Sequence, residues 1–154
     1  MNLNNHYDLA VIGAGPAGMA AAIEASRNNM KVLVLDDQPA AGGQVYRQID
    51  RNYHKNEELF FLGEDYWLGK KLVDDFKHSS AEFFPESRVW QITLDKHVFF
   101  SRKGRAYQVQ ANFILISTGA TERPMPIPGW TLPGVMSVGG CLLYTSPSPR
   151  DDEL

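Results

Sequence analysis

The amino-acid sequence predicts an α/β fold that begins with a parallel strand–helix–strand unit. A short apolar run, Leu9 to Ile12, is flanked by polar residues, as a buried parallel strand would be. A glycine-rich turn and a helical segment from about Pro16 to Asn28 follow, and a second apolar run spans Val32 to Leu35. The length of 154 residues, 44% of them hydrophobic, suits a single globular domain.

Composition and charge exclude several classes of partner and site. The net charge is −3 without any basic block, which gives a nucleic-acid partner no electrostatic support. No apolar run is long enough to span a bilayer, and the polar N-terminus lacks the pattern of a secretory signal. We therefore expect a cytoplasmic protein without a membrane partner. A single cysteine, Cys141, can form neither an internal disulfide nor a thiolate cluster, and we expect no metal site.

Gly13, Gly15 and Gly18 form a G-x-G-x-x-G spacing between the first strand and the helix. Gly13 permits a tight turn, Gly15 has no side chain that would keep a pyrophosphate away, and Gly18 lets the helix pack close on the strand. The start of the helix, which includes Pro16 and Ala17, points unpaired N–H groups and a partial positive charge at that phosphate. The alternative is a structural turn without a ligand.

Acidic residues end the second strand. Asp36 lies 23 residues after Gly13, where a carboxylate can accept hydrogen bonds from an adenosine ribose, and Asp37 follows it. A carboxylate at this point disfavours a 2′-phosphate, so we do not expect NADP here. The motif does not distinguish FAD from NAD, because both contain an ADP half.

The stretch DDQPAAGGQVYRQID, residues 36–50, contains a glycine pair that lets the chain pass close beside a ligand. Gly43 belongs to this pair. Gln44 offers both a donor and an acceptor, and Arg47 can pair with a phosphate or a carboxylate. A plain surface loop after the second strand is the alternative, and the residues alone leave both interpretations open.

A second helix is predicted from about Tyr66 to His78. Its apolar residues recur at helical spacing and are interpreted as core rather than as an aromatic cofactor box: Trp67, Leu68, Leu72, Val73 and Phe76. Three short strands are then predicted over Val89–Leu94, Val98–Arg102 and Tyr107–Val109, before a further strand, Phe113–Ser117. The polar triplets Asp95–His97 and Lys103–Arg105 separate them as hairpin turns.

The stretch FILISTGATERPMPIPGW is the second informative motif. Thr118 and Gly119 let the strand end turn sharply against a ligand, and Arg123 can meet a phosphate or hold the following crossover in place. Three spaced prolines then stiffen the exit as an extended segment. A proline-rich domain linker without cofactor contact is the alternative.

Three segments together resemble the FAD-binding start of the NAD(P)/FAD-dependent oxidoreductase family: VIGAGPAGMAAA, VLVLDDQPAAGGQVYR and STGATERPMPIPGWTLPGVMSVGG. The resemblance covers about residues 6–140. It is most specific to the alpha or A subunits of opine oxidase, hydrogen cyanide synthase, sarcosine oxidase and proline or hydroxyproline dehydrogenase. The matching segment has no redox cysteine pair, which distinguishes it from the disulfide reductases with the same type of fold.

The resemblance implies a Rossmann-like FAD-binding domain with a three-stranded antiparallel β-meander inserted in its parallel sheet. It places a backbone contact to adenine at Val89 and the FAD close to Thr118 and Gly119. The candidate cofactor-binding residues are Gly13, Gly15, Pro16, Ala17, Gly18, Asp36, Asp37, Gly43, Gln44, Arg47, Val89, Thr118, Gly119 and Arg123. FAD is the expected cofactor, and NAD(P) is the candidate ligand of a downstream domain.

The last residues, CLLYTSPSPRDDEL, differ abruptly in composition from the rest. Residues 141–151 resemble one reading frame of a sequencing-library adapter, so we expect residues 141–154 to be an artefactual tail rather than a disordered natural one. Residues 1–140 are then the N-terminal part of a FAD/NAD(P)-binding domain. Because family members complete the FAD site with later segments, we expect this truncated chain to be inactive and to retain FAD weakly.

The activity implied by the resemblance is oxidation of amine or imino-acid substrates by an FAD-dependent subunit that works beside a second flavoprotein subunit. Two alternatives stay open: an NAD(P)H-dependent flavoprotein reductase of ferredoxin or another acceptor, and a non-catalytic nucleotide-binding module. No catalytic base is assigned. The four histidines, His6, His54, His78 and His97, are interpreted as surface residues.

Overall fold

The computed structural model describes residues 4–49, 64–120 and 126–137. The chain divides into two compact units, Met1–Gly119 and Ala120–Leu154. In the second unit, residues 126–137 form consecutive turns, with hydrogen bonds such as that from Trp130 N to Ile127 O at 3.0 Å. The first unit holds all of the described helices and strands.

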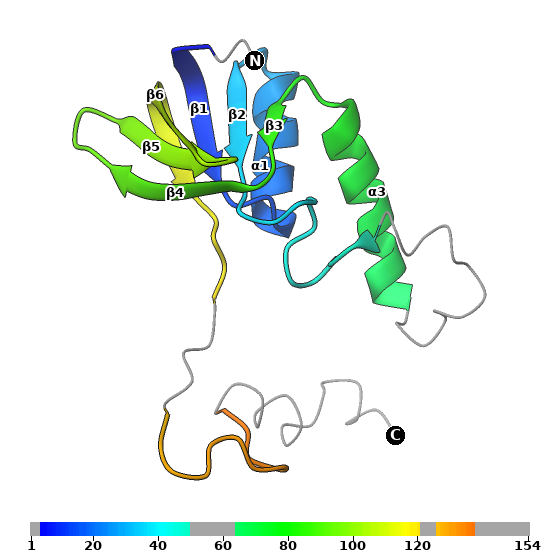
Figure 1. Ribbon diagram of the computed structural model, residues 1–154. Helices are drawn as coiled ribbons and strands as arrows, with labels where there is room; N and C mark the ends of the chain where they lie inside the picture. The colour runs from blue at the N-terminus through cyan, green and yellow to red at the C-terminus, as the bar shows by residue number, and fades with distance from the viewer. Residues whose placement is uncertain (1–3, 50–63, 121–125, 138–154) are drawn as a thin grey trace. The chain divides into compact units, whose positions relative to one another are not determined.

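The described elements form one six-stranded sheet with two helices (Figure 1). In chain order they are β1 (His6–Ile12), α1 (Pro16–Arg27), β2 (Val32–Leu35), α3 (Glu64–His78), β3 (Glu82–Phe84), β4 (Ser87–Ile92), β5 (His97–Arg102) and β6 (Arg105–Ile116). The strand order is β3-β2-β1-β6-β5-β4. The pairs among β3, β2, β1 and β6 are parallel, and β6-β5 and β5-β4 are antiparallel. The predicted parallel start and antiparallel meander are therefore confirmed.

The two faces of β2 belong to different hydrophobic clusters, which is why its run of four apolar residues is completely buried. Val32 and Val34 pack in one cluster with residues of α1 and α3, which lie together on that side of the sheet (Figure 1). Leu33 and Leu35 pack in the other cluster, with Val98 and other apolar residues of the meander. The two hydrophobic clusters therefore pack on opposite faces of the sheet at β1 and β2, and the glycine turn begins at the end of β1.

The first helix agrees with its predicted signals. Gly15 is the N-cap, Pro16 occupies the first turn, and the helix ends at Arg27, one residue before the predicted end. Asn29, after the helix, has a φ of 59°, in the left-handed region. Asn29 N donates to Ser26 O at 3.0 Å and Met30 N donates to Ala25 O at 3.1 Å, the pattern that closes a helix around a left-handed residue.

The predicted core stripe of α3 is wrong at Leu68, which is 71% exposed. Val73 and Phe76 are buried, whereas Trp67 and Leu72 are partly buried against the same cluster. Gly69 is buried, with the Tyr46 ring 2.2 Å from where its Cβ would be, and it recurs at helical spacing with the buried Val73 and Phe76. Leu68 lies about 100° from Gly69 around the helix, outside this buried face.

Two predicted strands form a single element. The runs Tyr107–Val109 and Phe113–Ser117, the latter as far as Ile116, are both part of β6, whose residues 105–110 pair with β5 and whose residues 110–116 pair with β1. The backbone pairing continues without a break through the residues between the two runs. The strand β3 was not predicted, because three residues are too few for a periodic signal.

The hairpin turns lie where the sequence predicts them. Lys96 has a φ of 60°, and Lys103 and Gly104 have φ values of 49° and 74°. The first meander strand begins two residues earlier than predicted, and its register shifts between Val89 and Gln91. None of the helices in the described residues has the length and apolar character needed to cross a bilayer.

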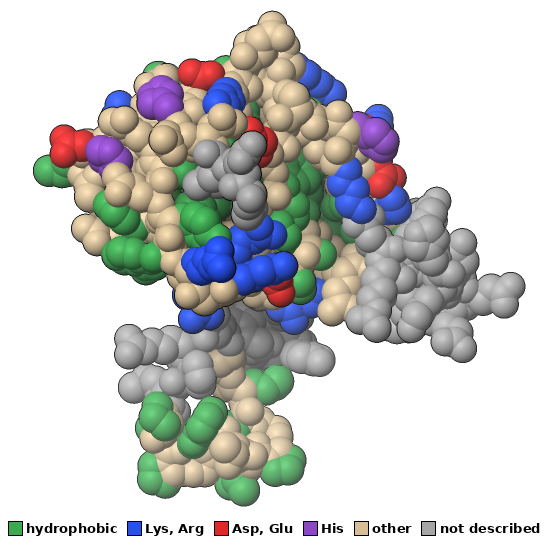
Figure 2. Space-filling view, turned by 45° about the horizontal axis from the view of Figure 1, so that its top comes forward, with side chains coloured by type: hydrophobic (Ala, Val, Ile, Leu, Met, Phe, Trp, Pro, Cys, Tyr) green, Lys and Arg blue, Asp and Glu red, His purple; other side chains and the backbone are tan. Residues whose placement is uncertain are grey.

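Large hydrophobic side chains reach the surface at several places, and Figure 2 shows such side chains between charged ones on one face. Phe113 and Ile116 of β6 are 64% and 65% exposed. Among the described strands, none pairs with the edge of residues 113–116 that faces away from β1. Unpaired strand edges are normally covered or blunted in folded proteins. Because they are three positions apart on a strand, the two side chains lie on opposite faces of the sheet beside this open edge, where more protein can pack.

A buried tyrosine connects two strands at the opposite end of the sheet from the glycine turn. Tyr7 of β1 is fully buried, and its hydroxyl donates to Glu82 Oε2 of β3 at 2.8 Å. Asn4 Nδ2 donates to the other oxygen of Glu82 at 2.9 Å. Lys31 lies over the Tyr7 ring, with its Nζ 5.2 Å from the ring centroid.

The stability of the fold should fall at high pH because of this tyrosine. Burial and the hydrogen bond to Glu82 raise the pKa of Tyr7 to about 12, whereas an unfolded tyrosine has a pKa of about 10. The contribution to the free energy of unfolding is therefore complete below about pH 10 and is lost as the pH rises towards 12. Urea unfolding across this range should show a shallower decline for Tyr7→Phe, and equal slopes would contradict the assignment.

Candidate functional site

The site lies where three neighbouring parallel strands end. The glycine turn follows β1, Asp36 follows β2, and Ser117 follows β6. Because β1 lies between β2 and β6 in the sheet, the carboxyl ends of all three strands meet at one edge. Ligands of open α/β sheets bind outside this edge.

The three glycines of the turn have different roles. Gly13 has a φ of 103°, and a Cβ there would lie 2.4 Å from Ser117 O. A Cβ at Gly18 would lie 1.9 Å from Gly13 O. A Cβ at Gly15 would come no nearer than 3.9 Å, to the Cα of Gly43. Gly13 and Gly18 thus permit close packing, whereas a Cβ at Gly15 would meet the protein only at ordinary van der Waals distance. A side chain is therefore not excluded there by the protein itself, as expected if Gly15 is needed for the predicted approach of a pyrophosphate.

The start of α1 is suited to an anion. Its N-cap, Gly15, makes no side-chain capping hydrogen bond, and the first turn of the helix contains no acidic residue. The backbone N–H groups of a helix's first turn have no partner within the helix, and they carry a partial positive charge. A phosphate beside Gly15 would therefore meet both unpaired donors and a favourable field.

The carboxylate of Asp36 lies against the glycine turn. Asp36 is buried, its Oδ2 accepts a hydrogen bond from Ala14 N at 2.5 Å, and its Oδ1 accepts one from Gln38 N at 2.8 Å. Each carboxylate oxygen can accept more than one hydrogen bond, so both backbone bonds leave capacity for a ribose hydroxyl. Asp37 is exposed, and its Oδ1 accepts from Gln38 Nε2 at 2.9 Å.

The glycine pair after β2 packs on the glycine turn. Gly42 has a φ of 130°, and its N–H donates to Ala14 O at 2.9 Å. Gly43 has a φ of 61°, and a Cβ there would lie 2.9 Å from the Cα of Gly15. The pair therefore forms one wall beside the open side of Gly15, in a position that only residues without side chains can occupy.

Most of the remaining predicted residues are exposed or pack elsewhere, away from the contacts among the glycine turn, Asp36 and the glycine pair. Gln44 and Arg47 are exposed, and the Arg47 carbonyl accepts a hydrogen bond from Tyr66 Oη at 2.8 Å. Val89 is partly buried against the second hydrophobic cluster. Thr118 and Gly119 follow β6 and are exposed. Pro16 and Ala17 lie in the first turn of α1, and Arg123 lies outside the described residues.

One residue at the site was not among the predicted ones. Ser117 Oγ lies 2.9 Å from Gly13 O and 3.1 Å from Ile12 O, so its hydroxyl donates to the backbone of the glycine turn. The residues around Ser117 do not indicate that its hydrogen-bond acceptor is Gly13, which is distant in sequence. The signal that could have predicted this role is a small hydroxyl residue at the end of a strand that pairs with the strand before the glycine motif.

The described histidines lie away from the glycine turn or face solvent, and none of them is a base at the site. His6 and His78 are exposed, His97 is partly buried beside the Phe99 ring, and His54 lies outside the described residues. Within residues 4–49, 64–120 and 126–137, no three His, Cys, Asp or Glu residues are grouped as metal ligands would be.

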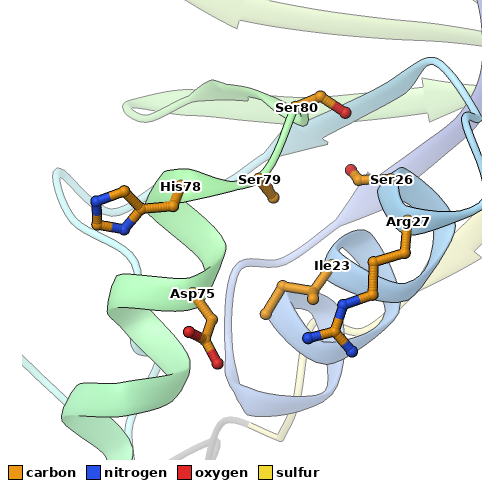
Figure 3. Close-up of a pocket in the computed structure, with 7 residues that line it drawn as sticks. All are labelled: Ile23, Ser26, Arg27, Asp75, His78, Ser79 and Ser80. Atoms are coloured by element: carbon orange, nitrogen blue, oxygen red, sulfur yellow. The ribbon is translucent and has the colours of Figure 1, made fainter.

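A second hollow lies at the carboxyl ends of α1 and α3, away from the glycine turn (Figure 3). It has a volume of about 260 Å³ and is lined by Ile23, Ser26, Arg27, Asp75, His78, Ser79 and Ser80. Several of its polar groups already have partners: His78 Nδ1 lies 2.7 Å from Asp74 O, and Ser79 Oγ donates to Phe76 O at 2.6 Å. Ser26 Oγ, which is buried at this hollow, has no hydrogen-bond partner among the described residues.

Comparisons with known proteins agree with this geometry. The sequence profile of the pyridine nucleotide-disulphide oxidoreductase family matches residues 7–142. One opine oxidase subunit, from Agrobacterium tumefaciens, is 47% identical over 90% of this chain and 29% of that protein. The HcnB subunit of hydrogen cyanide synthase from Pseudomonas aeruginosa is 35% identical over 86% of this chain and 29% of that protein.

A solved structure shows the same fold. The L-proline dehydrogenase of P. horikoshii matches with a TM-score of 0.60 and 20% identity, over 78% of this chain and 24% of that chain. The chain spans less than a third of the length of each of these relatives. Since the family profile covers nearly all of the strands and the whole glycine turn, the chain belongs to the pyridine nucleotide-disulphide oxidoreductase family.

Proposed function

We propose that this chain is the N-terminal FAD-binding part of a dehydrogenase or oxidase subunit that oxidises the carbon–nitrogen bond of amine or imino-acid substrates. The observation that carries the proposal is the open backbone at Gly15, which lies between an uncapped helix start and the buried carboxylate of Asp36. The family and the names of its relatives support the flavin and the class of substrate.

The roles of the residues follow from their positions. The first-turn amides of α1 bind the pyrophosphate, and Asp36 accepts hydrogen bonds from the adenosine ribose. Its negative charge opposes a 2′-phosphate at that ribose. The strand end at Thr118 and Gly119 lies beside the FAD, and Val89 offers its backbone to the adenine. FAD held at this site would supply the hydride-accepting chemistry, and these residues would bind and orient it.

Further protein should complete this site. Residues 1–140 are proposed to be the first part of the FAD domain, with residues 141–154 as a tail that is foreign to it. The exposed Phe113 and Ile116 beside an unpaired edge of β6 support additional packing there. The relatives are named as subunits, which supports a partner in the form of a second flavoprotein subunit. NAD(P) is proposed only for a downstream domain.

Spectroscopy of the full-length gene product tests the function. We expect it to purify yellow and to be bleached anaerobically by an opine, proline or sarcosine, because these substrates donate a hydride from a carbon next to nitrogen. The 154-residue chain should purify nearly colourless, because a flavin bound to it would be open to water.

Other outcomes identify the alternatives. If NADH or NADPH reduces the bound flavin and no amine does so, the protein is a reductase of ferredoxin or another acceptor. A full-length protein that binds adenine nucleotides but never flavin would indicate a non-catalytic module. A short chain that retains stoichiometric FAD would contradict the proposal that later segments complete the site.

A further inference from the structure

One peptide group of the glycine turn is held at both of its polar ends. The carbonyl of Gly13 accepts a hydrogen bond from Ser117 Oγ at 2.9 Å. The N–H of Ala14, on the other side of the same peptide plane, donates to Asp36 Oδ2 at 2.5 Å. The two side chains follow different strands, β6 and β2, so the peptide is fixed between them.

This peptide directly precedes Gly15, where the turn passes into α1. The next carbonyl, that of Ala14, accepts a hydrogen bond from Gly42 N at 2.9 Å. Two consecutive peptide groups are therefore oriented by partners outside the turn. Their orientation sets the direction in which the N–H groups after Gly15 point.

Packing leaves no room for a different arrangement around the Ser117 hydroxyl. A Cβ at Gly18 would lie 2.7 Å from Ser117 Oγ, and a Cβ at Gly13 would lie 2.4 Å from Ser117 O. The hydroxyl thus packs between Gly13, after the end of β1, and Gly18, in the first turns of α1. Ser117 N also donates to Ile12 O at 2.8 Å, which fixes the backbone that carries the hydroxyl.

We propose that Ser117 is a positioning residue for the cofactor, because its hydroxyl presets the Gly13–Ala14 peptide in the orientation that aims the helix amides at a pyrophosphate. The inference rests on the proposed function, in which this turn binds FAD. Ser117 touches the turn and acts through it. A preset turn loses less conformational freedom when the ligand binds, so the hydroxyl contributes to affinity as well as to packing.

The test compares Ser117→Ala with Ser79→Ala in the full-length gene product. Ser79 Oγ makes the same type of bond, to Phe76 O at 2.6 Å, at the end of α3 away from the turn. We expect Ser117→Ala to raise the FAD dissociation constant about fivefold, as loss of one net hydrogen bond predicts, and Ser79→Ala to change it less than about twofold.

Hydrogen exchange gives a readout that needs no FAD. In the apoprotein, exchange of the peptide that contains residues 12–19 should be faster in Ser117→Ala than in the parent, while Ser79→Ala leaves it unchanged. An unaltered FAD dissociation constant in Ser117→Ala would overturn the positioning role. If the parent itself binds no FAD, the proposed function fails, and unaltered exchange in Ser117→Ala would then overturn the preset turn separately.

Discussion

Gly15→Ala should fold like the parent protein and lose most of its affinity for FAD. Gly15 has a φ of −74° and a ψ of −177°, a conformation that alanine adopts freely. The new Cβ would meet only the Cα of Gly43, at 3.9 Å, so the protein itself offers no clash. The methyl group would instead occupy the space that the pyrophosphate needs. Forced overpacking costs about 1–3 kcal/mol, which corresponds to a loss of affinity of about 5- to 150-fold.

The measurement for Gly15→Ala has two parts. Flavin fluorescence titration of the full-length apoprotein gives the dissociation constant, and urea unfolding without FAD gives the free energy of unfolding. We expect the second quantity to change by less than about 0.5 kcal/mol, as for other substitutions that avoid the core and special backbone conformations. An affinity equal to that of the parent would place the pyrophosphate elsewhere.

Gly18→Ala should give the opposite result, a destabilised protein even without a cofactor. Its Cβ would lie 1.9 Å from Gly13 O and 2.7 Å from Ser117 Oγ. The first of these is a backbone atom at the end of a buried strand, so the helix and the strand must move apart. Overpacking of about 3 kcal/mol would exceed the gain of up to about 1 kcal/mol from replacing a helical glycine by alanine.

Urea unfolding of the apoprotein measures this effect, and the two glycine variants serve as controls for each other. They make the same chemical change three positions apart, one in open space and one against the backbone. Equal stability of Gly18→Ala and the parent would show that α1 does not pack on β1 as closely as described. Equal losses of stability in both variants would contradict the separate roles of the two glycines.

Local patterns predicted much of the fold and of the site. The apolar runs of β1 and β2, the helix start at Pro16 and the left-handed Asn29 are each encoded within a few residues. The prediction failed at Leu68, an apolar residue that is exposed, whereas the neighbouring Gly69 is buried under the distant Tyr46 ring. The apolar pattern of the helix alone does not show that a glycine lies at the centre of its buried face.

The β–α–β start and the glycine spacing are encoded in the sequence alone, because strand length, helix caps and backbone freedom are properties of neighbouring residues. The sequence does not show which distant side chains form hydrogen bonds to the glycine turn. Ser117 bonds to Gly13 across 104 positions, and Asp36 bonds to Ala14 across 22. Only the tertiary structure brings these groups within 3 Å of each other, because the parallel pairing of β2, β1 and β6 aligns the strand ends that carry them.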